Sequence, residues 1–472
     1  MTRSLEQAAL RCLLPGFEGT EAPEWVLRRA AEGLGGVCLY ARNIQSPDQL
    51  ARLCARLHAE NPGLIIAIDE EGGDVTRLEA ATGSSYPGNL ALGAADNVGI
   101  TFVVARQIGL ELARAGVDLD LAPDADVNSN PSNPVIGVRS FGSDPAAVAA
   151  QTVAWVGGLQ SAGVAACVKH FPGHGDTSVD SHVALPVVGA DPHASGALQP
   201  FAAAIKAGVK AVMSAHIRVT SMDDAPATLS RRIMTGLLRD ELGFQGLTVT
   251  DGIEMKAIPD VAQGSVRALE AGCDLVCIGG GLADEDVVTQ LQRAIASAVP
   301  AERLQEAAGR VDALAAWRAT QSVQEPPNPA AGLAAARLAL RVDGNVQVGD
   351  DVVVVQLVPH SSMASGVIPW GVAGPLAERG ARVTTFEHRD GPADLVPDLE
   401  AARGRSLVLT VRNLHRHEWQ QAAADRLLRA RPDAVVVEMG LPGCRPAAAA
   451  AYIATSGAAR VCAIAAAEVM RP

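Results

Sequence analysis

The stretch VAACVKHFPGHGDTSVDSH, residues 164–182, joins a short apolar run to a polar loop. Residues 164–168 are small and apolar, which is typical of a buried strand. Pro172, Gly173 and Gly175 follow, and they do not permit a regular helix. The stretch therefore predicts a strand whose carboxyl end carries a loop rich in ionisable side chains, with three histidines, two aspartates and one lysine.

The same pattern recurs through the first two thirds of the chain. Short β-type runs alternate with longer helical stretches, at residues 36–40, 64–68, 117–121, 164–168, 211–214, 247–250 and 273–278. Polar residues follow these runs, namely Arg42, Asn43, Asp69, Glu70, Glu71, Asp124, Asp126, Lys169, His170, His216, Arg218 and Asp251. Repeated βα units predict a parallel sheet, and polar residues at the strand ends are typical of a (β/α)8 barrel. We therefore expect an α/β protein with an N-terminal TIM-like (β/α)8 barrel.

A second domain is expected after the barrel, because 472 residues exceed what one hydrophobic core usually serves. Residues 321–329, QSVQEPPNP, cannot continue a helix and mark a linker. A helical stretch and five β-type runs follow, at residues 352–358, 383–386, 407–411, 434–437 and 461–464. We predict a barrel over residues 1–320, a linker and helix over 321–345, and a smaller α/β sandwich with a mostly parallel sheet over 346–472.

Composition and charge exclude several classes of protein. A hydrophobic content of 48% with 19% charged residues fits a compact globular chain. The net charge of -13, without a stripe of Lys or Arg, argues against a nucleic-acid partner. No apolar run is long enough to cross a membrane. Glu6, Gln7 and Arg11 interrupt the N-terminal region, so we expect no signal peptide and a cytoplasmic location. The eight cysteines form no CxxC pair, which argues against structural zinc.

Five motifs in this chain resemble glycoside hydrolase family 3, in particular its bacterial β-N-acetylglucosaminidase branch. They are IDEEGGDVTRL (68–78), PVIGVRSFG (134–142), KHFPGHGDTSVDSH (169–182), MSAHI (213–217) and VTDGIEM (249–255), in the family's order. The resemblance covers residues 1 to about 320, whereas the C-terminal part is similar to the family's second domain only in architecture. It implies a retaining exo-β-N-acetylglucosaminidase that acts on a small carbohydrate with a terminal β-GlcNAc and needs no cofactor or metal.

The resemblance also assigns the catalytic residues. The nucleophile falls on Asp251, a carboxylate that would attack the anomeric carbon and form a glycosyl-enzyme. The following Gly252 lets the substrate approach closely. The acid/base falls on His182, and an imidazole with a reference pKa of about 6.5 can give and take a proton near neutrality. Asp180 would orient that ring and stabilise its charged form.

The sugar-binding residues implied by the resemblance are Asp69, Arg77, Arg139, Lys169 and His170. Charged donors and acceptors make stronger hydrogen bonds to sugar hydroxyls than neutral groups do. His216 follows another strand, and either substrate contact or structural support fits it.

Three further positions near these motifs carry expectations of their own. We expect His174 to shape its loop. The family commonly has Gln where Glu70 stands and a basic residue where Asp74 stands, so the sequence predicts an unusually acidic pocket rim.

Alternative functions remain open on the sequence alone. A zinc or two-metal hydrolase is disfavoured because the HxxxH spacing lacks a helical HExxH context and Lys169 stands beside it. A phosphorylase with the same residues would release a sugar 1-phosphate, and a broader β-glucosidase is also open. A non-enzymatic sugar-binding module is disfavoured because Asp251, Asp180 and His182 are all present. The sequence does not choose between chitobiose and GlcNAc-MurNAc as substrates, nor does it give the oligomeric state.

Overall fold

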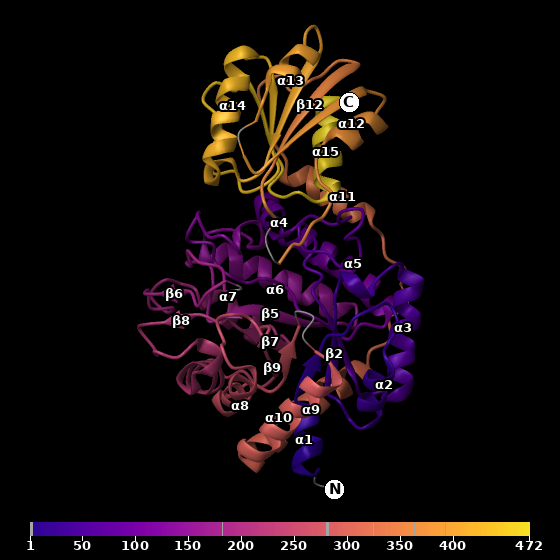
Figure 1. Ribbon diagram of the computed structural model, residues 1–472, viewed down its shortest axis with the longest axis vertical. Helices are drawn as coiled ribbons and strands as arrows, with labels where there is room; N and C mark the ends of the chain where they lie inside the picture. The colour runs from indigo at the N-terminus through magenta and orange to yellow at the C-terminus, as the bar shows by residue number, and fades with distance from the viewer. Residues whose placement is uncertain (1–2, 182, 280–282, 324, 362–363, 392) are drawn as a thin grey trace. The chain divides into compact units, whose positions relative to one another are not determined.

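The computed structural model describes residues 3–181, 183–279, 283–323, 325–361, 364–391 and 393–472 (Figure 1). The chain divides into two compact units. The first contains residues up to 71, 101–136 and 143–328, and the second contains 72–100, 137–142 and 329–472. Two early segments thus belong to the same unit as the C-terminal third. The domain boundaries that we derived from the sequence stay predictions.

The first unit is built on eight parallel strands. They are β1 (Leu13–Pro15), β2 (Gly36–Leu39), β3 (Ile65–Ile68), β4 (Leu119–Asp120), β5 (Ala165–Phe171), β7 (Ala211–Ser214), β9 (Leu247–Thr250) and β10 (Val276–Ile278). Six pair in the order β2-β3-β4-β5-β7-β9, and β1 pairs with β10. The N–H of Thr250 donates to Leu275 O at 3.0 Å, which connects β9 with the residues just before β10. This arrangement confirms the predicted TIM-like barrel.

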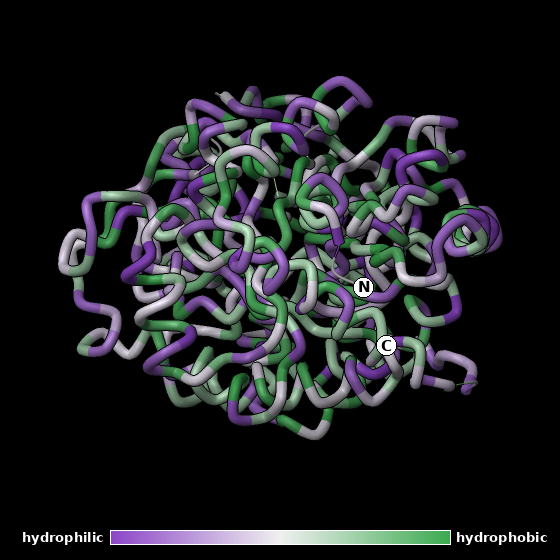
Figure 2. Tube along the Cα trace, turned by 90° about the horizontal axis from the view of Figure 1, so that it is seen from below, coloured by the Kyte–Doolittle hydropathy of each residue, from purple (hydrophilic) through white to green (hydrophobic). Residues whose placement is uncertain are grey.

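A helix follows each strand of the barrel. These helices are α2 (Glu24–Ala31), α3 (Pro47–Glu60), α5 (Val98–Ala115), α6 (Pro145–Ser161), α7 (Gln199–Lys206), the π-helix η4 (Arg232–Glu241), α8 (Val261–Ala271) and α9 (Glu285–Ala298). The helix α1 (Leu5–Arg11) precedes the barrel, and α10 (Ala301–Ala319) completes it. Side chains such as Ile65, Leu119, Cys167, Met213 and Val249 form its core. Figure 2 shows the resulting alternation of hydrophobic and hydrophilic segments along the chain.

An ion-pair network is centred on Asp274, which lies just before β10. Asp274 is fully buried, and its Oδ2 accepts hydrogen bonds from Thr248 N at 2.9 Å and from Arg239 at 2.6 Å. Its Oδ1 accepts from Arg303 at 2.6 Å and from Arg310 at 3.1 Å. One carboxylate therefore joins a strand, the helix η4 and the helix α10.

We expect Asp274→Asn to destabilise the protein by about 3–5 kcal/mol, because it removes the buried counter-charge of Arg239 and one of the two acidic partners of Arg303 and Arg310. The free energy of unfolding from urea titrations, followed by circular dichroism, measures this. Glu285→Gln is the control, since it removes an exposed pair with Arg28 and should cost less than about 0.5 kcal/mol. Equal effects of the two substitutions would contradict the role given to Asp274.

The second unit contains a six-stranded sheet. Its strands are β11 (Arg341–Asp343), β12 (Asp351–Val358), β13 (Arg382–Arg389), β14 (Ser406–Val411), β15 (Val435–Glu438) and β16 (Ala451–Ala454), in the order β11-β16-β15-β14-β12-β13. All pairs are parallel except that of β11 with β16. Its helices are α4 (Asn89–Ala95), α11 (Ala330–Ala339), α12 (Ala373–Glu378), α13 (Val396–Ala401), α14 (Glu418–Ala430) and α15 (Arg460–Met470). The mostly parallel α/β sandwich that we predicted is confirmed.

One predicted strand of this unit is wrong. Residues 461–464 lie in α15, and the strand of that region is β16, residues 451–454. The run contains Val461 and Ile464, which favour strands, but it stands in an alanine-rich stretch, and alanine is the strongest helix former. Helix propensity over the whole stretch therefore prevailed.

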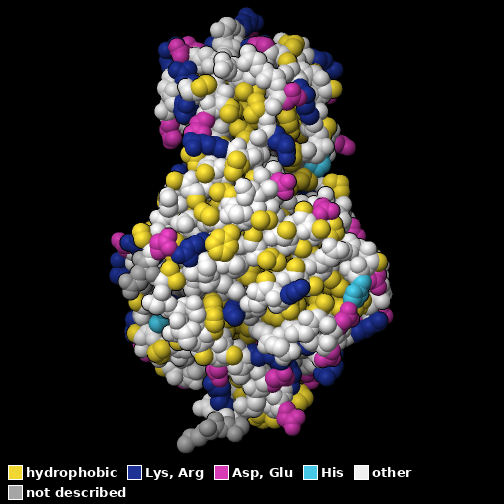
Figure 3. All heavy atoms as spheres, turned by 180° about the vertical axis from the view of Figure 1, so that it is seen from behind, with side chains coloured by type: hydrophobic (Ala, Val, Ile, Leu, Met, Phe, Trp, Pro, Cys, Tyr) yellow, Lys and Arg dark blue, Asp and Glu magenta, His cyan; other side chains and the backbone are white. Residues whose placement is uncertain are grey.

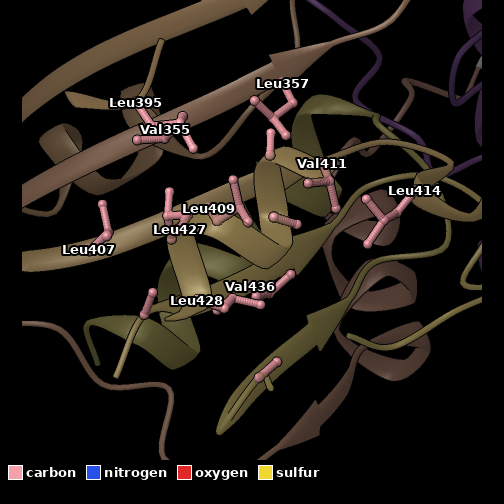
Figure 4. Packing of buried hydrophobic residues seen from close by; sticks show 14 of the residues in the cluster. Val355, Leu357, Leu395, Leu407, Leu409, Val411, Leu414, Leu427, Leu428 and Val436 are labelled. Carbon is pink, nitrogen blue, oxygen red and sulfur yellow. The ribbon is translucent and has the colours of Figure 1, made fainter. Parts of the chain in front are cut away.

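Both faces are buried along the central strands of this sheet, β12, β14, β15 and β16. Figure 4 shows Val355 and Leu357 of β12 with Leu409 and Val411 of β14, near Leu427 and Leu428 of α14. The alternate residues Val352 and Val354 belong to the core of the opposite face. Burial on both faces is the normal state of a parallel sheet and explains the nearly continuous apolar runs of β12 and β14.

The outer surface matches the expectation from composition. On the face shown in Figure 3, acidic and basic side chains are interspersed, and this face carries no basic stripe. Within the described residues, no helix is long and apolar enough to cross a membrane. The cytoplasmic location stays a prediction.

Candidate active site

The carboxyl ends of four barrel strands carry five of the predicted site residues. Asp69 follows β3, Lys169 and His170 lie at the end of β5, His216 follows β7, and Asp251 follows β9. The strands are parallel, so these ends lie on the same rim of the barrel, where active sites of this architecture form.

Lys169 is the centre of a buried charge cluster on this rim. Its Nζ lies 2.7 Å from Asp69 Oδ1 and 2.7 Å from Glu71 Oε1. The side chains of Lys169 and Glu71 are 2% and 3% exposed, whereas that of Asp69 is 19% exposed. Asp69 is therefore the member of the cluster that a ligand can reach. A carboxylate held by a buried ammonium is suited to accept hydrogen bonds from sugar hydroxyls.

His170 is held by a buried carboxylate. Its Nδ1 lies 2.7 Å from Asp126 Oδ2 and 3.8 Å from Asp124 Oδ2. Burial alone would raise the pKa of Asp126, but the hydrogen bond and charge of His170 outweigh burial, so that this pKa is lowered. Asp126 thus stays ionised and keeps a proton on Nδ1 of His170, which fixes the orientation of the ring.

The group of Asp124, Asp126 and His170 also offers ligand atoms within 4.8 Å of one another. A metal ion bound here would compete with the hydrogen bond between His170 Nδ1 and Asp126 Oδ2. Asp126 Oδ1 accepts the N–H of His174 at 2.6 Å, and Asp124 Oδ1 accepts the N–H of Asp126 at 2.9 Å. We therefore interpret the group as support for His170.

The loop after β5 is organised around His174. The ring is buried, and its Nδ1 and Nε2 lie 2.8 Å from Thr177 Oγ1 and 3.2 Å from Ser181 Oγ. Asn133 Nδ2 donates to the carbonyl of His174 at 2.9 Å. Burial lowers the pKa of His174 to about 4, so the ring is neutral near pH 7. These contacts fit the predicted role of His174 in shaping the loop.

The predicted acid/base pair lies at the end of this loop. Asp180 has a partly buried side chain, and its carbonyl accepts the N–H of Val183 at 2.9 Å. His182 lies outside the described residues. The pairing of Asp180 with His182 stays a prediction.

Asp251 is held by local contacts just beyond β9. Its Oδ1 accepts the N–H of Gly252 at 2.8 Å. His216 is fully buried; its Nε2 lies 3.0 Å from Gly252 O, and its Nδ1 lies 2.8 Å from Thr228 Oγ1. Because a carbonyl only accepts, Nε2 of His216 carries the proton in this contact. His216 therefore supports the backbone next to Asp251.

Arg77 and Arg139 belong to the second unit. Arg77 Nη2 donates to Ala364 O at 3.0 Å. Arg139 ends the short helix η2 (Gly137–Arg139), and its carbonyl accepts a hydrogen bond from Asn89 Nδ2 at 2.7 Å.

The expected acidic rim is wrong. Glu70 and Asp74 are 2% and 4% exposed, so neither carboxylate adds charge to a surface. Asp74 forms an ion pair with Arg412 in the second unit, and it also accepts the N–H of Ala458. No local pattern around Asp74 indicates this partner, which is more than 300 residues away in the chain.

Two supporting residues were missed by the sequence reasoning. Glu71 and Asp126 stand at predicted strand ends, but the family resemblance assigns them no role. The signal that could have found them is their spacing: each stands two residues from another strand-end carboxylate, Asp69 or Asp124. Alternate residues of an extended segment share a side, so paired carboxylates at this spacing can act together.

Comparisons with known proteins identify the family of this chain. The model of the glycosyl hydrolase family 3 N-terminal domain matches residues 18–314. Beta-hexosaminidase A of Pseudoalteromonas piscicida is 40% identical over 269 residues, which are 51% of this chain and 45% of that protein. This chain thus spans less than half the length of that relative. A beta-hexosaminidase of Alkalilimnicola ehrlichii is 38% identical over 281 residues, which cover 56% of this chain and 80% of that protein.

A solved structure extends the likeness to the whole chain. It is a glycoside hydrolase family 3 beta-N-acetylglucosaminidase from Paenibacillus sp. str. FPU-7, 31% identical, with a TM-score of 0.89. The match covers 99% of this chain and 97% of that one. The chain therefore belongs to glycosyl hydrolase family 3.

Proposed function

We propose that this chain is a retaining exo-β-N-acetylglucosaminidase that releases terminal GlcNAc from chito-oligosaccharides or from GlcNAc-MurNAc fragments. The observation that carries the proposal is the placement of Asp251 at the rim of the barrel. Its carboxylate accepts the N–H of Gly252, and the carbonyl of Gly252 is in turn bound by His216. The names of the similar proteins support the choice of sugar.

The first step is formation of a glycosyl-enzyme. A carboxylate oxygen of Asp251 attacks the anomeric carbon, while the bond to the leaving oxygen breaks and His182 donates a proton to that oxygen. In the second step, His182 removes a proton from water, and the oxygen of that water displaces Asp251. Two inversions retain the β configuration.

The remaining site residues bind the terminal sugar in this proposal. Asp69 accepts hydrogen bonds from hydroxyl groups while Lys169 balances its charge, and His170 is oriented by Asp126. Arg77 and Arg139 donate to the same sugar, as the family resemblance implies. Hydrogen bonds to charged groups strengthen this binding.

Substrate preference tests the proposal directly. We expect 4-nitrophenyl β-GlcNAc to be cleaved at least about a hundredfold faster than the corresponding β-glucoside, measured as kcat/KM, because a site that binds the acetamido group loses that contact with glucose. Activity should survive EDTA. Equal rates on the two sugars would instead indicate a broader β-glucosidase.

Product analysis identifies the acceptor of the glycosyl group. Chitobiose and GlcNAc-MurNAc, each with and without phosphate, should give free GlcNAc in every case. Release of GlcNAc 1-phosphate when phosphate is added would identify a phosphorylase. The faster of the two disaccharides identifies the preferred leaving group.

A further inference from the structure

The segment that carries Arg77 begins with a tight turn. Gly72 and Gly73 have φ values of +72° and +61°, which favour glycine, and a Cβ on Gly73 would lie 2.5 Å from Gly88 Cα. The N–H of Val75 donates to Gly72 O at 3.2 Å and closes the turn. Asp74 lies within this turn and is buried.

Asp74 is bound by two other segments of the second unit. Its Oδ1 accepts the N–H of Ala458, just before α15, at 2.8 Å. Its Oδ2 accepts a hydrogen bond from Arg412 Nη2, and the side chains of the pair are only 3% and 11% exposed. The guanidinium of Arg412 also lies 5.8 Å from the centre of the Trp370 ring. A charge pair with so little contact with water is strongly coupled.

Arg412 is itself rigidly placed. It directly follows β14, whose Val411 and Leu409 are packed in the core shown in Figure 4. The side-chain amide of Gln420, which is fully buried on α14, accepts from Arg412 N at 3.3 Å and donates to Arg412 O at 3.0 Å. The ion pair of Asp74 and Arg412 therefore fixes the turn that contains Asp74 to the end of a packed strand.

Arg77 stands three residues after this anchor. A second anchor follows it, because Glu79 Oε1 lies 3.2 Å from Arg460 Nη2. That second pair is weaker, since the side chain of Arg460 is 41% exposed. The buried pair of Asp74 and Arg412 is thus the stronger constraint on the backbone that presents Arg77.

We propose that Asp74 and Arg412 are positioning residues for Arg77 and thereby strengthen the binding of the terminal sugar by Arg77. The inference rests on the proposed function, in which Arg77 binds that sugar.

A double-mutant cycle with 4-nitrophenyl β-GlcNAc tests this proposal. We expect Asp74→Asn to raise KM about tenfold while kcat changes less than about threefold, because a misplaced Arg77 weakens the binding of substrate and transition state alike. In an Arg77→Met background, Asp74→Asn should change KM less than about twofold, because the residue through which it acts is gone. Its effect on thermal stability should be the same in both backgrounds.

Two further variants separate positioning from general stability. Arg412→Lys keeps a cation next to Asp74 and should restore KM to within about threefold of the wild type, whereas Arg412→Met should match Asp74→Asn. Arg337→Met is the matched control, since it removes an exposed pair with Glu468 in the same unit and should leave KM unchanged.

The possible failures are distinguishable. If the effects of Asp74→Asn and Arg77→Met on KM simply multiply, or if the variants lose stability while KM stays constant, the positioning role is overturned and the pair is structural. If the wild type does not cleave the substrate at all, the proposed function fails and this inference fails with it.

Discussion

Replacement of Asp251 by Asn is expected to lower kcat/KM by at least about a thousandfold while leaving the fold intact, because an amide cannot form the ester intermediate of a retaining mechanism. The fold should survive because the side-chain oxygen of Asn can still accept the N–H of Gly252, as Asp251 Oδ1 does at 2.8 Å. Turnover of 4-nitrophenyl β-GlcNAc and the melting temperature together measure the two expectations.

A matched substitution on the same connection serves as the control. Asp260 is exposed and caps α8 by accepting the N–H of Gln263 at 3.0 Å. Asn is as good a helix cap as Asp, so Asp260→Asn should change neither activity nor stability. A 5-fluoro glycosyl donor should trap the enzyme with its label on Asp251. A label on another carboxylate would refute the assignment of the nucleophile.

The barrel could be predicted because its strands leave a local signal. Runs such as residues 164–168 and 247–250 are short, apolar and followed at once by ionisable residues, which is the pattern of buried parallel strands. The strand at 451–454 was missed for the converse reason. Its sequence, AYIA, stands in the alanine-rich C-terminal region, where local propensity does not separate strand from helix.

The burial of Asp74 could not be predicted, because it depends on contacts between distant parts of the chain. Its partner Arg412 and the N–H of Ala458 become neighbours only when the second unit is assembled. Read locally, an aspartate after two glycines is a typical exposed turn residue. The same holds for Asp126, whose pairing with His170 requires the loop after β4 to meet the end of β5. The end of a strand can be recognised from neighbouring residues, whereas the partners of the side chains at that end lie far away in the sequence.

The second large effect concerns His182 and depends on the leaving group. With a dinitrophenyl glycoside, His182→Ala should form the glycosyl-enzyme readily, because that leaving oxygen needs no proton, and should then stall because no base activates water. A burst of dinitrophenol followed by a steady rate at least about a hundredfold below the wild-type rate is the expected time course. Added azide should restore turnover and give a glycosyl azide.

With a disaccharide the same variant should be nearly inactive, since an alkoxide leaves poorly without protonation. Asp180→Ala should behave alike but more mildly, because it only orients and charges the imidazole. His193→Ala, at a half-exposed histidine, should behave like the wild type.

If His182→Ala lost activity equally on both substrates and azide did not rescue it, the acid/base would have to be sought elsewhere. His174 would then be a poor substitute, because burial holds its pKa at about 4 and both ring nitrogens already face Thr177 and Ser181. His216 is also committed to contacts with Gly252 and Thr228, so a negative result would point back to a carboxylate of the rim.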